Sequence, residues 1–152
     1  MTPTVRPATA RDAMVLSPRL RAADADEFLA NGRCPTAGLL RAVGLSAIAN
    51  CILSPSGQPL AIVGFARIDD ETGCPWMVGS ADLVTTHRRW FIQHSHEIAA
   101  MGDGLFRSFF NWVDARNTAH VRWLRWVGFD VHPAVPQGPF GLLFHPFYRT
   151  AP

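Results

Sequence analysis

The segment between residues 47 and 80 constrains the fold of this 152-residue chain more than any other part of it. It contains three apolar runs with a high propensity for strands, at positions 47–53, 60–68 and 76–80. The two connecting segments are rich in Ser, Pro, Asp and Gly, which favour tight turns. Consecutive strands joined by tight turns pair with each other in antiparallel fashion. The sequence therefore predicts a central antiparallel meander.

Helical patterns precede the meander. A short strand at residues 4–9 is followed by a brief helix that Asp12 opens. Residues 20–32 form a second predicted helix, with acidic residues at its start, where the helix dipole favours them. Pro35 suits the first turn of a third helix. One strand and three helices are thus expected before the meander begins.

Further helices are predicted after the meander. Residues 87–101 and 119–127 have helical patterns, and the segment 141–145 is the expected final strand. A further helix is predicted between the first two, because apolar residues recur there at helical spacing, namely Leu105, Phe106, Phe109, Phe110 and Val113. Together these elements predict an α/β (α+β) fold, a mixed sheet with a central antiparallel meander flanked by helices.

The composition supports one folded domain spanning residues 1–152, because 48% of the residues are hydrophobic and only 17% are charged. The tail of this domain, residues 133–152, is rich in Pro and Phe, and it either closes the sheet or docks onto a partner. No apolar run reaches the roughly 20 residues that a membrane span needs, and no secretion signal is expected.

Charge and cysteine content exclude further classes of function. The net charge of +2 is too small to indicate a nucleic-acid partner by itself. The three cysteines form no C-x-x-C pair, which favours free thiols over a structural zinc site. His94 and His96 are two residues apart on a predicted helix and point in different directions, so no metal site is expected.

The late segment from Asn117 to Phe129 resembles a motif of the GCN5-related N-acetyltransferase (GNAT) family, in which a helix begins at an Asn and ends at Gly-Phe. The order of the predicted elements is also similar to that family's. The resemblance implies a GNAT-like fold, acyl-CoA as cofactor, and backbone groups of Val78, Gly79 and Ser80 that hold its pantetheine arm. Arg88 and Arg89, in the first turn of their helix, are candidates for a bound phosphate.

A longer pattern is similar to the GNAT-like internal virion proteins of short-tailed bacteriophages. That resemblance implies a role in virion structure and assembly, with other virion proteins as partners. It also implies a location in the particle or in the host bacterial cytoplasm during assembly. The segments that carry it include residues 6–9, the trio Arg21, Asp24 and Glu27, and residues 57–64, 76–80 and 122–129.

Several features that acyl transfer requires are missing from the sequence. The segment 80–89 contains no glycine that would let the backbone approach a diphosphate, and Asp82 adds a negative charge there. Leu124 stands where many GNAT enzymes place a proton-donating tyrosine. Asp82 and Glu97 are conceivable general bases, but each is more readily a solvated charge. The sequence therefore leaves the catalytic residues unknown, and no bound cofactor is expected.

Two groups of residues suggest contacts with partners. Arg21, Asp24 and Glu27 share one helix face, which indicates a salt-bridged surface or a contact between subunits. The chain is also rich in aromatic residues, and large aromatic side chains outside a core often anchor a partner. The candidate anchors are Trp90, Trp112, Phe140, Phe144 and Phe147.

Three functional hypotheses follow. The favoured one is a virion structural or assembly protein built on a catalytically degenerate GNAT fold, a pseudoenzyme. The alternative is an active acyl-CoA-dependent N-acyltransferase that binds acetyl-CoA. The least favoured is a nucleic-acid-binding module that uses Arg88, Arg89, Arg122 and Arg125.

Overall fold

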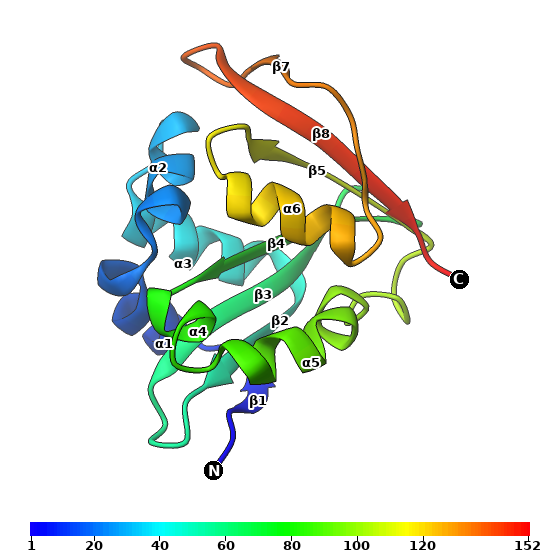
Figure 1. Ribbon diagram of the computed structural model, residues 1–152. Coiled ribbons are helices and arrows are strands. Elements are labelled where there is room, and N and C mark those ends of the chain that lie inside the picture. Colours follow the sequence, from blue (N-terminus) through cyan, green and yellow to red (C-terminus); the bar gives the residue numbers. More distant parts are fainter.

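The computed structural model describes residues 1–152, which fold around one mixed sheet (Figure 1). Its strands follow the order β1-β2-β3-β4-β5-β8-β6, and β7 pairs with β8. The predicted meander is confirmed, because β2, β3 and β4 pair in antiparallel fashion in sequence order. The strands are β1 (Thr4–Pro7), β2 (Ser46–Leu53), β3 (Pro59–Arg67), β4 (Thr72–Gly79), β5 (Ser108–Asp114), β6 (Asp130–Val131), β7 (Val135–Gln137) and β8 (Leu142–Thr150).

Helices cover both faces of this sheet, and each face has its own hydrophobic core. Alternate residues of β3 point to opposite faces, so Ile62 joins the cluster with α1 and α3 while Val63 joins the cluster with α5 and α6. None of the helices combines the length and apolar character needed to cross a membrane. They are α1 (Ala10–Leu16), the 3-10 helix η1 (Ser17–Arg19), α2 (Ala22–Ala30), α3 (Pro35–Leu45), α4 (Ala81–Val84), α5 (Arg88–Ala99) and α6 (Thr118–Trp126).

The helix predicted around the stripe Leu105–Val113 is wrong, because most of this segment is strand β5. Its residues Phe109, Phe110, Trp112 and Val113 are aromatic or β-branched, and such residues favour strands. Phe109 and Val113 are buried in the core that α5 and α6 cover. The apolar spacing was therefore compatible with a helix, but residue type and sheet pairing decide in favour of a strand.

The C-terminal tail is part of the sheet. Strand β8 pairs with β5 along the whole of β5, from Ser108↔Thr150 to Asp114↔Phe144. Phe144 and Phe147 are only 1% and 3% exposed, so the prediction that they anchor a partner is wrong. Phe140, by contrast, is 66% exposed between β7 and β8.

Strands β4 and β5 are parallel neighbours that separate after a short contact. They pair only at Thr72↔Ser108 and Gly73↔Phe109. Slightly further along, the Asn111 side chain still bridges them, because its Nδ2 donates to the Pro75 carbonyl at 2.7 Å. Beyond that point β4 continues beside β3 and β5 beside β8, which leaves a gap in the sheet that α6 crosses (Figure 1).

The N-terminal strand is held to α1 by a buried carboxylate, which allows a test. Asp12 accepts two hydrogen bonds from the Arg6 guanidinium, at 2.7 and 2.9 Å, and also caps the helix through the Thr9 N–H. Hydrogen bonding to Arg6 is the main reason why the pKa of Asp12 is lowered. We expect Asp12→Asn to reduce the free energy of unfolding by about 1–2 kcal/mol at pH 7.

The same prediction has a pH dependence with a definite sign. A lowered pKa in the folded protein stabilises it above the ordinary carboxyl pKa of about 4, and this contribution is lost as the pH falls through the folded value. Urea denaturation at pH 7 and pH 3 should show a smaller difference between wild type and Asp12→Asn at the lower pH. A difference that stays constant would contradict the assignment to Asp12.

Candidate active site

A cavity of about 120 Å³ lies where β4 and β5 separate. Phe28 and Trp76 line it from the side of α1–α3, while Phe65 and Phe129 line it from the side of α5 and α6. The cavity therefore passes through the sheet, between its two hydrophobic cores. Of its 20 lining residues, 14 are hydrophobic.

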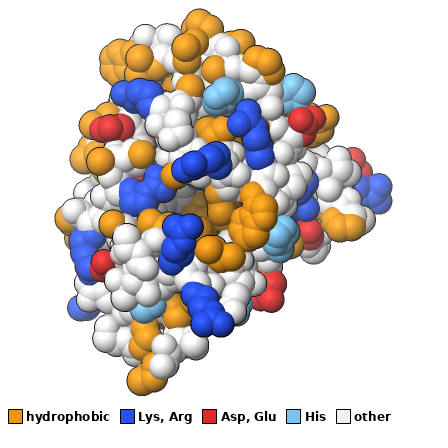
Figure 2. Space-filling model, viewed as in Figure 1, with side chains coloured by type: hydrophobic (Ala, Val, Ile, Leu, Met, Phe, Trp, Pro, Cys, Tyr) orange, Lys and Arg blue, Asp and Glu red, His pale blue; other side chains and the backbone are white.

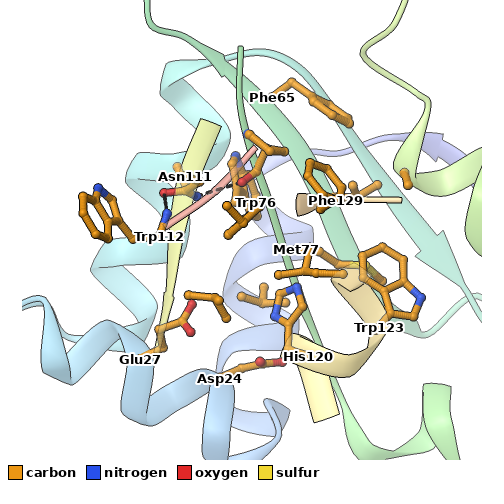
Figure 3. Close-up of a pocket in the computed structure, with 18 of the residues that line it drawn as sticks. Asp24, Glu27, Phe65, Trp76, Met77, Asn111, Trp112, His120, Trp123 and Phe129 are labelled. Carbon is orange, nitrogen blue, oxygen red and sulfur yellow. Dashed lines mark hydrogen bonds between the residues drawn. The ribbon is translucent and has the colours of Figure 1, made fainter. Parts of the chain in front are cut away.

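The ionisable groups of this first cavity are Asp24, Glu27 and His120 (Figure 3). Glu27 Oε1 accepts a hydrogen bond of 2.8 Å from the Asp114 N–H, and burial raises the pKa of Glu27 to about 7. Burial also lowers the pKa of His120, so its imidazole is neutral at pH 7. Glu27 can therefore exchange a proton near neutral pH, which is the property required of a general base, and neutral His120 has one ring nitrogen free to receive a proton.

Asp24 connects α2 to both sides of the gap. Its Oδ2 accepts a hydrogen bond of 3.0 Å from the Gly79 N–H at the end of β4, and its Oδ1 accepts one of 3.0 Å from Asn117 Nδ2 at the start of α6. Arg21 completes the network, since its Nη2 donates to Asn117 Oδ1 at 2.8 Å. Asp24 is only 4% exposed, so it does not belong to a salt-bridged surface as predicted. Its hydrogen bonds instead connect α2, β4 and α6 inside the protein.

A second, larger cavity of about 670 Å³ adjoins the first. Its lining includes Arg21, Arg88 and Arg122, and no arginine lines the first cavity. Figure 2 shows basic side chains around a hollow with hydrophobic side chains on the face that carries α5 and α6. The residues that line both cavities are Asp24, Met77, Val78, His120 and Trp123.

Several solved structures with a similar arrangement of strands and helices are described as acetyltransferases. A GCN5-related N-acetyltransferase from Kribbella flavida aligns with 98% of this chain and 98% of its own, with a TM-score of 0.64 and 18% identity. Ard1 from Thermoplasma volcanium aligns with 100% of this chain and 99% of its own, with a TM-score of 0.74 and 12% identity. The chain has the GNAT fold. No family model and no curated protein matches it.

The comparisons contradict the predicted role as a virion assembly protein. Structures that match this GNAT-fold chain over nearly its whole length are described as acetyltransferases. One of them, a phosphinothricin acetyltransferase from Sinorhizobium meliloti solved with AcCoA, has a TM-score of 0.63 and 15% identity, covering 99% of this chain and 89% of its own. The prediction of a virion role, which rested on a resemblance in short segments, is therefore wrong.

The GNAT fold places most of the predicted cofactor residues beside the second cavity. Val78, Gly79, Ser80 and Arg88 line it, whereas Arg89 does not. The Ser80 N–H, however, donates a hydrogen bond of 2.8 Å to the Leu60 carbonyl, and the Gly79 N–H donates one of 3.0 Å to Asp24 Oδ2. Both N–H groups therefore already have a hydrogen-bond partner within the protein.

Met77 is the residue of β4 whose backbone N–H and C=O groups face the gap without a hydrogen-bond partner. Ladder hydrogen bonds alternate along an antiparallel strand, and Ser80 bonds to β3 through Leu60. Val78, two residues before, therefore also faces β3, while Met77 and Gly79 face away from it. A ligand in the gap would find free backbone groups at Met77, a residue that the sequence analysis did not single out.

The other candidates from the sequence lie outside the two cavities or supply no proton. Leu124 lines the first cavity but cannot donate a proton. Asp82 lines neither and pairs with Arg19 at 3.1 Å, and Glu97 is exposed on α5. His120 lies one turn before Leu124 on α6, so the late-helix motif contained the signal that could have identified it.

Two of the aromatic residues predicted to anchor a partner are partly buried in the fold. Trp112 lines the first cavity instead of presenting a free surface. Trp90 packs against the core and stacks on His94, with 4.4 Å between ring centroids. Of the arginines in the nucleic-acid hypothesis, Arg88 and Arg122 line the second cavity, so their charges are directed to a concave site.

Proposed function

We propose that the protein is an acyl-CoA-dependent N-acyltransferase. The observation that carries the proposal is the pair of adjoining cavities at the point where β4 and β5 separate. Three arginines line one cavity, Glu27 and no arginine line the other, and Asp24 and His120 line both. This arrangement suits an anionic acyl donor on one side, an amine on the other, and a proton-transferring group between them.

The second cavity fits the chemistry of CoA. Leu83, Phe91 and Trp126 provide apolar surface for the pantetheine arm, and arginines provide charge for the phosphates. The helix α5 begins at this cavity, and His87 supplies no side-chain cap to its first amide groups. Those amides and the helix dipole favour an anion, which offsets the absence of a glycine-rich turn. When bound, the thioester supplies an activated acyl group.

The residues of the first cavity account for both protons that the reaction must move. An ammonium substrate first loses a proton to the carboxylate of Glu27, whose pKa is about 7, and then to solvent. The free amine forms a C–N bond with the thioester carbonyl carbon while the C–S bond breaks. The second amine proton passes to neutral His120 and from there to the departing thiolate. The products are an amide and free thiol.

Binding of acetyl-CoA is the direct test of this proposal. A ligand at about 100 times its dissociation constant stabilises a protein by roughly 2.7 kcal/mol, so acetyl-CoA should raise the melting midpoint. Arg122→Ala should reduce that shift, because Arg122 lines the second cavity. Arg125→Ala, an exposed arginine on the same helix, is the matched control and should retain it. An unchanged midpoint at millimolar acetyl-CoA would rule the proposal out.

A further inference from the structure

The first cavity differs from the second in charge. Two carboxylates, those of Asp24 and Glu27, line the first cavity, and no arginine does. Three arginines line the second, namely Arg21, Arg88 and Arg122. Arg21 lies 3.8 Å from Asp24 and balances its charge, whereas Glu27 forms no ion pair. A molecule that enters the first cavity therefore meets an unbalanced carboxylate at Glu27, which favours an ammonium group and disfavours a carboxylate.

The size of the first cavity limits what that ammonium group can be attached to. Its volume is about 120 Å³. An apolar protein cavity of roughly 150 Å³ is large enough to hold benzene. The first cavity is slightly smaller than that, so it limits the bound group to about one ring or a short branched chain, and a longer polar chain would leave its polar groups without partners.

Aromatic side chains form walls that are already in place. The Trp76 indole N–H donates to Ser46 Oγ at 2.8 Å, and its ring packs on the backbone of Gly64. A Cβ at Gly64 would come within 2.4 Å of that ring, so the ring occupies the space that the glycine leaves open. Trp112 and Trp123 line the cavity as well. A flat apolar group can pack against such rings, whose positions Figure 3 shows.

We infer that the acceptor is a small primary amine with an apolar or aromatic body and no carboxylate, and that it binds in the first cavity with its ammonium group beside Glu27. That the amine accepts an acyl group rests on the proposed acyltransferase function. The preference of the cavity for such an amine rests on its lining residues alone. α-Amino acids are excluded as acceptors, because their carboxylate would face Asp24 and Glu27.

Calorimetric titration without acyl-CoA tests the binding preference. The probes are 2-phenylethylamine, phenylalanine, which adds a carboxylate, and 3-phenylpropionate, which lacks the amine. At pH 8, where Glu27 is ionised, 2-phenylethylamine should bind at least about tenfold more tightly than either of the others. Equal binding of phenylalanine would overturn the inference.

A pair of variants assigns this preference to Glu27. Glu27→Gln keeps an oxygen that can accept the Asp114 N–H but removes the charge, so it should weaken binding of 2-phenylethylamine about tenfold. Glu97→Gln, an exposed residue on α5 that lines neither cavity, should leave binding unchanged. Unchanged affinity in Glu27→Gln would also overturn the inference.

Release of free thiol from acetyl-CoA separates this inference from the proposed function. We expect thiol release with 2-phenylethylamine and none with phenylalanine. If acetyl-CoA binds and 2-phenylethylamine does not, the inference is overturned while the proposed function stands. If 2-phenylethylamine binds with the expected selectivity and no thiol appears, the proposed function fails while the binding preference of the cavity is upheld.

Discussion

Replacing His120 with alanine is expected to reduce kcat for acyl transfer by about a hundredfold or more, which is the usual loss when a general acid–base group is removed. His120 lines both cavities, so it is placed to take a proton from the amine and return it to the sulfur. Burial keeps it neutral at pH 7 and therefore able to accept that proton. The measurement is the rate of thiol release under saturating substrates.

Two controls distinguish catalysis from a structural defect. The variant should still show the rise in melting midpoint with acetyl-CoA, because the arginines and apolar residues of the second cavity remain. Added imidazole should restore part of the lost rate, since the alanine leaves space in the cavity. A rate close to that of wild type would show that His120 transfers no proton in the limiting step.

The largest effect on stability is expected from Asp24→Ala. The substitution leaves the Gly79 N–H and Asn117 Nδ2 without their acceptor, and both lie in a buried network. Arg21, whose guanidinium lies 3.8 Å from Asp24, loses its opposite charge. Because uncompensated buried polar groups are costly, we expect the free energy of unfolding to fall by about 3–5 kcal/mol.

Urea denaturation measures this loss, and α2 itself offers a matched control. Asp26 is an exposed aspartate on the same helix, so Asp26→Ala should change stability by less than about 0.5 kcal/mol. A loss in Asp24→Ala no greater than in Asp26→Ala would show that the network across the gap contributes little to folding. Loss of the folded state altogether would agree with the prediction.

The trio Arg21, Asp24 and Glu27 illustrates how far sequence patterns reach. Their spacing correctly places them on one side of α2, because helical geometry is local. It does not reveal what that side faces. Buried acids are uncommon in proteins, so an exposed salt-bridged surface was the natural expectation. In the structure this side faces the gap, where Asn117 and backbone N–H groups satisfy the carboxylates.

Sequence alone determined the meander, because turn chemistry and strand propensity act over a few residues, and it identified the late helix that ends at Gly128-Phe129. Strand β5 was missed, because its pairing with β8 involves residues far away in the chain. Only the tertiary structure decided the site. The gap exists because β4 pairs with β3 and β5 pairs with β8 beyond their short contact with each other. The pKa values of Glu27 and His120 depend on the groups that bury them at this gap.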